Sequence, residues 1–192
     1  MDSSVSYFDL IVANMRDARK LFRLFKSVNE YQKIMEIIAK GSNNNLDFIL
    51  NIANRIGFLL YWFFDNLVIL AKVKFLKLEI KPLNKAGSTF WFLALVAALI
   101  TNLKALYFNV AKLEILKGEY HSKREEGTKL EIKKLISART GIFLNIIKTL
   151  GDMITSSQAS EIFPKLTNKN FNDGWIGLGG LTSAVITSYQ LY

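Results

Sequence analysis

The chain has 192 residues, no cysteine, one histidine and a formal net charge of +9, and 51% of its residues are hydrophobic. The absence of cysteine excludes disulfides, thiolate metal sites and thiol catalysis. A chain that is both basic and strongly apolar favours an anionic membrane as its partner. Nucleic acid is not expected, since proteins that bind it keep their aromatic side chains on a polar groove.

Residues 1–41 are predicted to form a basic amphipathic helix, broken once at most. Seven apolar side chains recur at three- and four-residue spacing and share one face, namely Leu21, Leu24, Phe25, Val28, Tyr31, Met35 and Ile38. A basic stripe has similar spacing and comprises Arg16, Arg19, Lys20, Arg23 and Lys26. Gly41 and the Asn-rich residues after it end the helix. Such a helix either lies in the headgroup layer of a membrane or packs in a bundle with a solvated basic face.

An apolar helix is predicted over residues 46–77, capped by the Asn run. Only Asp65 is charged in the sixteen residues between Arg55 and Lys72. Sixteen helical residues extend about 24 Å, which is short of a hydrocarbon core of roughly 30 Å. We therefore expect this helix to be buried against neighbours or to lie at membrane depth within a bundle. A basic connection over 72–85 follows, in which Pro82 should end regular structure.

A membrane helix with a polar extension is predicted over residues 86–120. The eighteen residues 86–103 carry no charge, and aromatic residues gather at one end, as in an interfacial aromatic belt. The alternative is a buried core helix. A solvated loop is expected over 117–129, an amphipathic helix over 129–155 and a linker over 156–174.

Residues 174–192 are predicted to form a Gly-rich C-terminal membrane segment. Its small residues Gly179 and Ser183, and Gly180 and Ala184, are spaced four apart, which lets helix backbones approach closely in lipid. Gly177 belongs to the same set. The whole chain is thus predicted to be one all-α domain over 1–192. We expect a membrane-associated helical bundle with long amphipathic helices and one to three membrane-embedded helices.

Catalytic chemistry is not indicated. The sequence has no phosphate-binding glycine loop, no metal-ligand spacing and no set of nucleophile, base and orienting residue. We therefore expect no enzyme activity, no cofactor and no metal. Asp65 and Asn66 are interpreted as structural polar residues in an apolar helix, although an intramembrane acid could also serve a proton or solute path.

Three stretches in order resemble the peroxin eleven family of peroxisomal membrane-elongation proteins. They are RKLFRLFKSVNEY (19–31), RIGFLLYWFFDNLVILAKV (55–73) and WIGLGGLTSAVITSY (175–189). The family's aromatic stretch with Asp and Asn is matched by Tyr61, Trp62, Asp65, Asn66, Leu70 and Lys72. The likeness covers residues 12 to 190, with an N-terminal region that we expect to be shorter than is usual in the family.

The resemblance implies a non-enzymatic protein that shapes the peroxisomal membrane by helix insertion and self-association and helps to recruit the fission machinery. A wedge of Leu21, Phe22, Leu24, Phe25 and Val28 would expand one leaflet. The basic stripe that includes Arg19, Lys20, Arg23 and Lys26 would hold anionic lipid headgroups.

Two other functions remain open at this point. The chain could be a structural accessory subunit of a large respiratory complex in the mitochondrial inner membrane, where other subunits would be its partners. It could also be a small-solute channel that uses Asp65 in a polar path.

Overall fold

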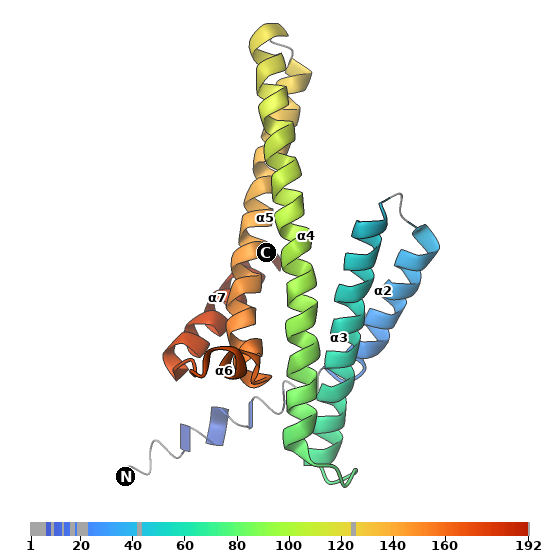
Figure 1. Ribbon diagram of the computed structural model, residues 1–192, viewed down its shortest axis with the longest axis vertical. Helices are drawn as coiled ribbons and strands as arrows, with labels where there is room; N and C mark the ends of the chain where they lie inside the picture. Colours follow the sequence, from blue (N-terminus) through green and yellow to red (C-terminus); the bar gives the residue numbers. More distant parts are fainter. Residues whose placement is uncertain are drawn as a thin grey trace.

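A computed structural model describes residues 7–8, 10–12, 14–15, 18, 23–41, 44–123 and 126–191. Within these residues the chain is helical throughout and connected by short turns (Figure 1). The helices are α2 (Lys26–Lys40), α3 (Asn45–Lys72), α4 (Ile80–Lys123), α5 (Glu126–Ala159), α6 (Ile162–Thr167) and α7 (Asp173–Leu191). The predicted all-α bundle is confirmed.

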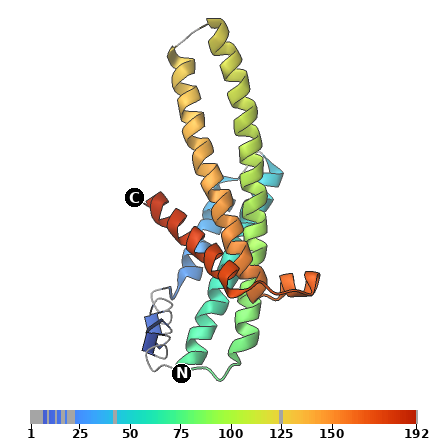
Figure 2. The ribbon, with the colours of Figure 1, turned by 90° about the vertical axis from the view of Figure 1, so that its left-hand side faces the viewer.

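The helices pack mainly on their neighbours along the chain. α2 lies against α3, α3 against α4, α4 against α5, and α5 against α7. α4 and α5 form a long antiparallel hairpin whose tip projects beyond the α2–α3 pair (Figure 1). α7 does not run alongside α5 but crosses it obliquely (Figure 2). At the base of the hairpin, Lys85 of α4 pairs with Glu161, which lies just before α6, and this ammonium holds the pKa of Glu161 below its usual range.

The first predicted helix is broken at residues 23–25. The described residues between Tyr7 and Ala18 are helical, and a turn precedes α2, with Phe25 in the left-handed region at φ 65°. Gly41 caps the end of α2 at φ 61°, and its N–H donates to the carbonyls of Ile37 and Ile38. The side chain of Asn44 accepts hydrogen bonds from the first N–H groups of α3, so both predicted boundaries are correct.

Two predicted boundaries near Pro82 are wrong. α3 ends at Lys72 rather than residue 77, and α4 begins at Ile80, so Pro82 starts a helix instead of ending regular structure. Proline is tolerated there because N–H groups in the first turn of a helix have no intrahelical acceptor.

The predicted solvated loop over 117–129 is also largely wrong, as is the linker over 156–174. Gly118 lies inside α4 and Gly127 in the first turn of α5, so the two helices run almost to their shared tip. Side-chain ion pairs support this part of the hairpin, such as Lys112 with Glu131 at 2.7 Å. α5 continues to Ala159, and the short α6 contains Pro164.

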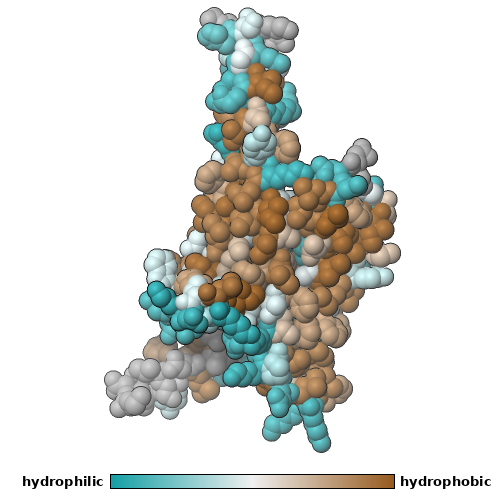
Figure 3. Space-filling model, viewed as in Figure 1, coloured by the Kyte–Doolittle hydropathy of each residue, from teal (hydrophilic) through white to brown (hydrophobic). Residues whose placement is uncertain are grey.

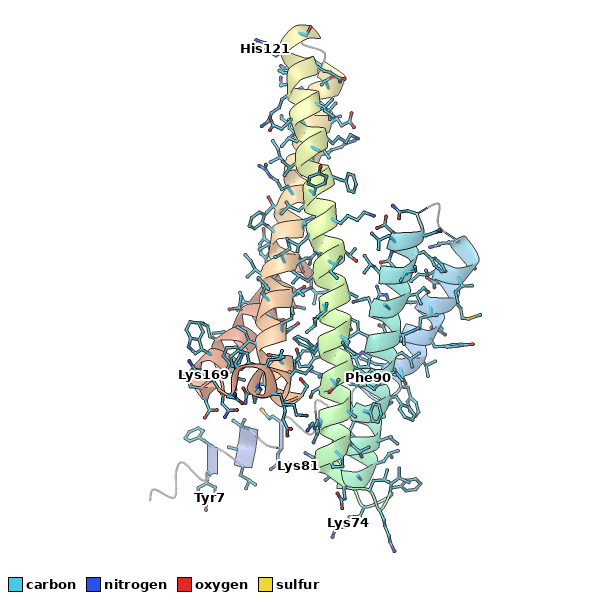
Figure 4. All side chains as sticks on the ribbon, viewed as in Figure 1. Tyr7, Lys74, Lys81, Phe90, His121 and Lys169 are labelled. Atoms are coloured by element: carbon cyan, nitrogen blue, oxygen red, sulfur yellow. The ribbon has the colours of Figure 1, made fainter. Side chains whose placement is uncertain are left out.

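The buried core is small and follows the seams between helices. Ala94 of α4 is fully buried and faces Gly57 of α3, where an added Cβ would lie 2.7 Å from that of Ala94. Many large apolar side chains are instead exposed, and they cover the middle of the molecule (Figure 3). Charged residues gather towards the ends, with Lys74 and Lys81 at the opposite end from His121 (Figure 4).

Two of the described helices, α3 and α4, are long and apolar enough to cross a membrane. Only 22% and 17% of their most apolar stretches are buried within the protein, whereas the core helix of a soluble protein would be mostly buried. α7, predicted as a membrane segment, is not one of the two. The exposed apolar belt is what lipid would cover.

Candidate membrane interface

A stripe of exposed apolar side chains runs along α2. It consists of Val28, Tyr31, Met35 and Ile38, which are 48% to 53% exposed and spaced three or four residues apart. We refer to these four residues as the outer stripe of α2. The adjoining apolar residues Ile34 and Ile37 are half-buried where α2 packs on α3. The apolar face of this helix is thus divided between α3 and the surroundings.

Side-chain contacts fix which way the outer stripe points. Glu30 of α2 is 8% exposed and accepts a hydrogen bond from Arg55 of α3 at 3.0 Å and one from Lys33 at 2.7 Å. The ammonium of Lys26 lies 4.9 Å from the centre of the Trp62 ring on α3, and the guanidinium of Arg23 lies 5.6 Å from it. These contacts place the charged side of α2 beside α3 and leave the stripe outside.

The predicted headgroup-binding cations are only partly described. Arg16, Arg19 and Lys20 lie outside the described residues. Arg23 and Lys26 both lie over Trp62, so each has an aromatic partner within the chain. A cation–π contact of this kind contributes about 0.5–1 kcal/mol at an exposed site, which leaves these cations able to attract an anion as well.

The residues predicted to form the membrane wedge are also only partly described. Leu21 and Phe22 lie outside the described residues, Leu24 is partly exposed, and Phe25 is 71% exposed. Val28 belongs to the outer stripe. The sequence placed Tyr31, Met35 and Ile38 on the apolar face but did not include them in the wedge. Their three- and four-residue spacing was the available signal, and only the packing of α2 on α3 shows which part of that face is exposed.

Asp65 and Asn66 lie in α3, in its apolar part. Asp65 is 7% exposed and lines a cavity of about 130 Å³ between α3 and α4, together with Tyr61, Ser88 and Trp91. The side-chain oxygen of Asn66 is buried and has no hydrogen-bond partner among the described residues. The buried, interhelical position of Asp65 agrees with a structural role, which remains a prediction.

The small residues of α7 are divided between two faces. Gly179 touches Gly151 of α5 so closely that an added Cβ on either glycine would lie 2.6 Å from the other's carbonyl oxygen. Ser183 is buried one turn further along the same face. Asp152 of α5 lies beside it; burial raises the pKa of this carboxyl group, while Ser183 and Lys148 partly lower it again.

The other predicted packing residues of α7 face outwards. Gly177, Gly180 and Ala184 are exposed, and a Cβ added at either glycine would meet nothing within 4 Å. α7 therefore uses one set of small residues for its crossing with α5 and leaves a second set open.

Comparisons with known proteins agree with the sequence resemblance. The family model for Peroxisomal biogenesis factor 11 (PEX11) matches residues 2–192, a longer stretch than the expected 12 to 190. The chain is 26% identical over 193 residues to Peroxisomal membrane protein 11 homolog of Dictyostelium discoideum, covering 91% of this chain and 74% of that protein. No solved structure matches.

Both matches are to peroxisomal proteins, so the favoured predicted location, the peroxisomal membrane, is confirmed. The exposed apolar belt and the two helices long enough to cross a bilayer fit this location. The family consists of peroxisomal membrane factors and is not a known enzyme family. The chain belongs to the PEX11 family and is a peroxisomal membrane protein of the elongation and division type.

Proposed function

We propose that this chain elongates the peroxisomal membrane by inserting the outer stripe of α2 into one leaflet, while α3 and α4 anchor it in the bilayer. The observation that carries the proposal is the stripe itself, an exposed apolar row on a helix that also presents Lys26, Lys33 and Lys40. Because α2 runs alongside α3 (Figure 1), it would enter the leaflet next to this anchor, with the outer stripe facing the lipid. Insertion into one leaflet enlarges that leaflet and bends the membrane.

The energy available to such a wedge is adequate for binding. Full burial of a large apolar side chain contributes about 1.5–3 kcal/mol, so each half-exposed residue of the stripe contributes about 1 kcal/mol when lipid covers it. Attraction of the lysines to anionic lipid adds about 1 kcal/mol per cation near the surface. Packing of α2 on α3 means that the helix does not have to fold on the membrane, so this energy is not spent on ordering it.

The anchor is supported by the surfaces of α3 and α4. Ile49, Ile56 and Phe63 form an exposed apolar row on α3, and Leu93, Ile100 and Leu103 are exposed on α4. Self-association is the second part of the proposal. The open small residues Gly177, Gly180 and Ala184 on the outer face of α7 would let a second copy approach closely in lipid.

The test is reconstitution of the full chain into vesicles that contain anionic lipid, with the number of tubules counted by electron microscopy. Met35→Glu places a charge in the middle of the outer stripe and should lower the number of tubules at least tenfold, because about 2 kcal/mol or more of insertion energy is lost. Met35→Leu keeps the apolar surface and should tubulate like the unaltered chain.

Gln32→Glu adds the same charge at an exposed position on the polar edge of α2, beside the stripe. It should reduce tubulation only slightly. Equal loss in Met35→Glu and Gln32→Glu would show that net charge matters rather than insertion, and unchanged tubulation by Met35→Glu would refute the wedge.

A further inference from the structure

A pocket of about 320 Å³ lies between α2 and α3, on the charged side of α2 rather than beside the outer stripe. Three cationic side chains line it, Lys26 and Lys33 from α2 and Arg55 from α3, against one carboxylate, that of Glu30. Its volume is at the lower end of the range of about 300–1,000 Å³ that is typical of ligand sites. We refer to this cavity as the α2–α3 pocket.

Glu30 pairs with Lys33 and Arg55 but does not occupy all of their N–H donors. Its side chain is 10% exposed, while those of Lys33 and Arg55 are 45% and 36% exposed, so the carboxylate lies deep and the cations reach towards the opening. The ammonium nitrogen of Lys33 lies 2.7 Å from one carboxylate oxygen of Glu30, and a guanidinium nitrogen of Arg55 lies 3.0 Å from the other. An ammonium has three N–H donors and a guanidinium five, so donors remain for an anion.

The rest of the lining combines an amide with an apolar wall. Asn29 of α2 supplies a neutral polar side chain, and Phe58 and Trp62 of α3 supply aromatic surface. Lys26 is held over the Trp62 ring and makes no ion pair with Glu30 in the described contacts, so its charge is available to the pocket. A site with convergent cations beside aromatic surface suits an anionic head attached to an apolar body.

We propose that the α2–α3 pocket binds the phosphate headgroup of an anionic lipid. Basic pockets between helices at a membrane surface bind phosphorylated lipid heads, and charge-assisted hydrogen bonds from arginine and lysine to phosphate are among the strongest in proteins. Lipid is favoured over a soluble phosphate compound because Phe58 and Trp62 offer a surface for glycerol and acyl groups, and because the protein resides in a membrane. The proposal deepens the proposed function and rests on its placing of α2 at the membrane surface.

Binding is measured with the full chain in nanodiscs of phosphatidylcholine. Trp91→Phe and Trp175→Phe leave Trp62 as the single tryptophan, so its fluorescence reports on the pocket. The probe is a short-chain phosphatidylinositol phosphate, and short-chain phosphatidylcholine is the uncharged control. We expect saturable quenching or a spectral shift with the anionic probe and none with phosphatidylcholine. No response to the anionic probe would overturn the proposal.

The pocket variants are Lys26→Gln and Lys33→Gln. Each should weaken binding roughly tenfold, the effect expected when one charge-assisted hydrogen bond is lost. Lys117→Gln is the matched control, because Lys117 pairs with Glu114 three residues earlier at 2.9 Å, just as Lys33 pairs with Glu30, but lies on the distant hairpin. It should bind within about twofold of the unaltered chain. Equal weakening by all three variants would show nonspecific charge attraction and would overturn the pocket.

A soluble inositol phosphate distinguishes the source of the phosphate. It should bind at least tenfold more weakly than the lipid probe, and equal affinity would overturn the lipid assignment. Met35→Glu separates this proposal from the wedge, because it should leave probe binding unchanged while it reduces tubulation. If Lys33→Gln loses probe binding and Met35→Glu tubulates normally, the pocket is retained and the wedge is refuted. If Lys33→Gln binds the probe normally and Met35→Glu loses tubulation, the wedge is retained and the pocket is refuted.

Discussion

α2 packs on α3 and α7 packs on α5, but the two helices are held by different kinds of contact. α2 is held to α3 by long charged side chains, through Glu30 with Arg55 and through two cations over Trp62. α7 is held to α5 by backbone contact between Gly179 and Gly151. The first kind of contact lines a polar pocket, whereas the second leaves no room even for a Cβ atom. The contact between α2 and α3 therefore leaves charged groups accessible, whereas the contact between α7 and α5 is closed.

The largest effect is expected where backbones touch. Gly179→Ala puts a Cβ 2.6 Å from the carbonyl oxygen of Gly151, and backbone cannot move aside as a side chain can, so we expect a loss of about 2 kcal/mol or more of folding stability. Thermal unfolding in detergent, followed by circular dichroism, measures it. Gly180→Ala meets nothing within 4 Å and should instead stabilise by up to about 1 kcal/mol through helix propensity. Equal effects of the two substitutions would mean that α7 does not cross α5 as described.

A smaller effect is expected on the α2 side. Arg55→Gln leaves the buried Glu30 with Lys33 alone, and since Arg55 is itself partly exposed we expect a loss of about 1–2 kcal/mol. The double variant Glu30→Gln with Arg55→Gln should recover part of this loss, because neither charge is then left buried without its partner.

The matched control for Arg55→Gln is Lys112→Gln, which breaks the exposed pair with Glu131 and should cost less than about 0.5 kcal/mol. If Arg55→Gln costs no more than this control, Glu30 does not hold α2 in place.

The smallest effect concerns the pH dependence of the α5–α7 crossing. Burial raises the pKa of Asp152 above its ordinary value of 3.8, so the folded state holds this proton more tightly than the unfolded state. Stability therefore falls as the pH rises from about that ordinary value through the raised pKa. Asp152→Asn should flatten this part of the stability curve, because the neutral amide has no proton to lose in this pH range.

Unfolding midpoints between pH 3.5 and 7 in detergent would measure this dependence, with Asp173→Asn as the control for an exposed acid on α7. A slope that Asp152→Asn leaves unchanged would show that Asp152 does not cause it.

The sequence predicted helix ends correctly where the capping residue and the backbone groups that it binds lie within one turn of each other. Gly41 marked the end of α2 and Asn44 the start of α3, because capping needs only neighbouring backbone groups. The interpretation of Pro82, Gly118 and Gly127 was wrong, because the same residue types can end a helix or lie inside one. Packing of α4 against α3 and α5 decides between these alternatives, since it offsets the propensity cost of glycine, about 1 kcal/mol per residue.

The helical class, the apolar and basic character of the chain and its membership of the PEX11 family follow from the amino-acid sequence, because composition, periodicity and ordered motifs are properties of the chain alone. The three-dimensional packing was needed to show which apolar residues of α2 are exposed and which glycine of α7 touches α5. It also brought Arg55 of α3 next to Lys26 and Lys33 of the preceding helix, α2. These features depend on the rotation of each helix about its axis, and that rotation is fixed by packing between helices rather than by periodicity within one.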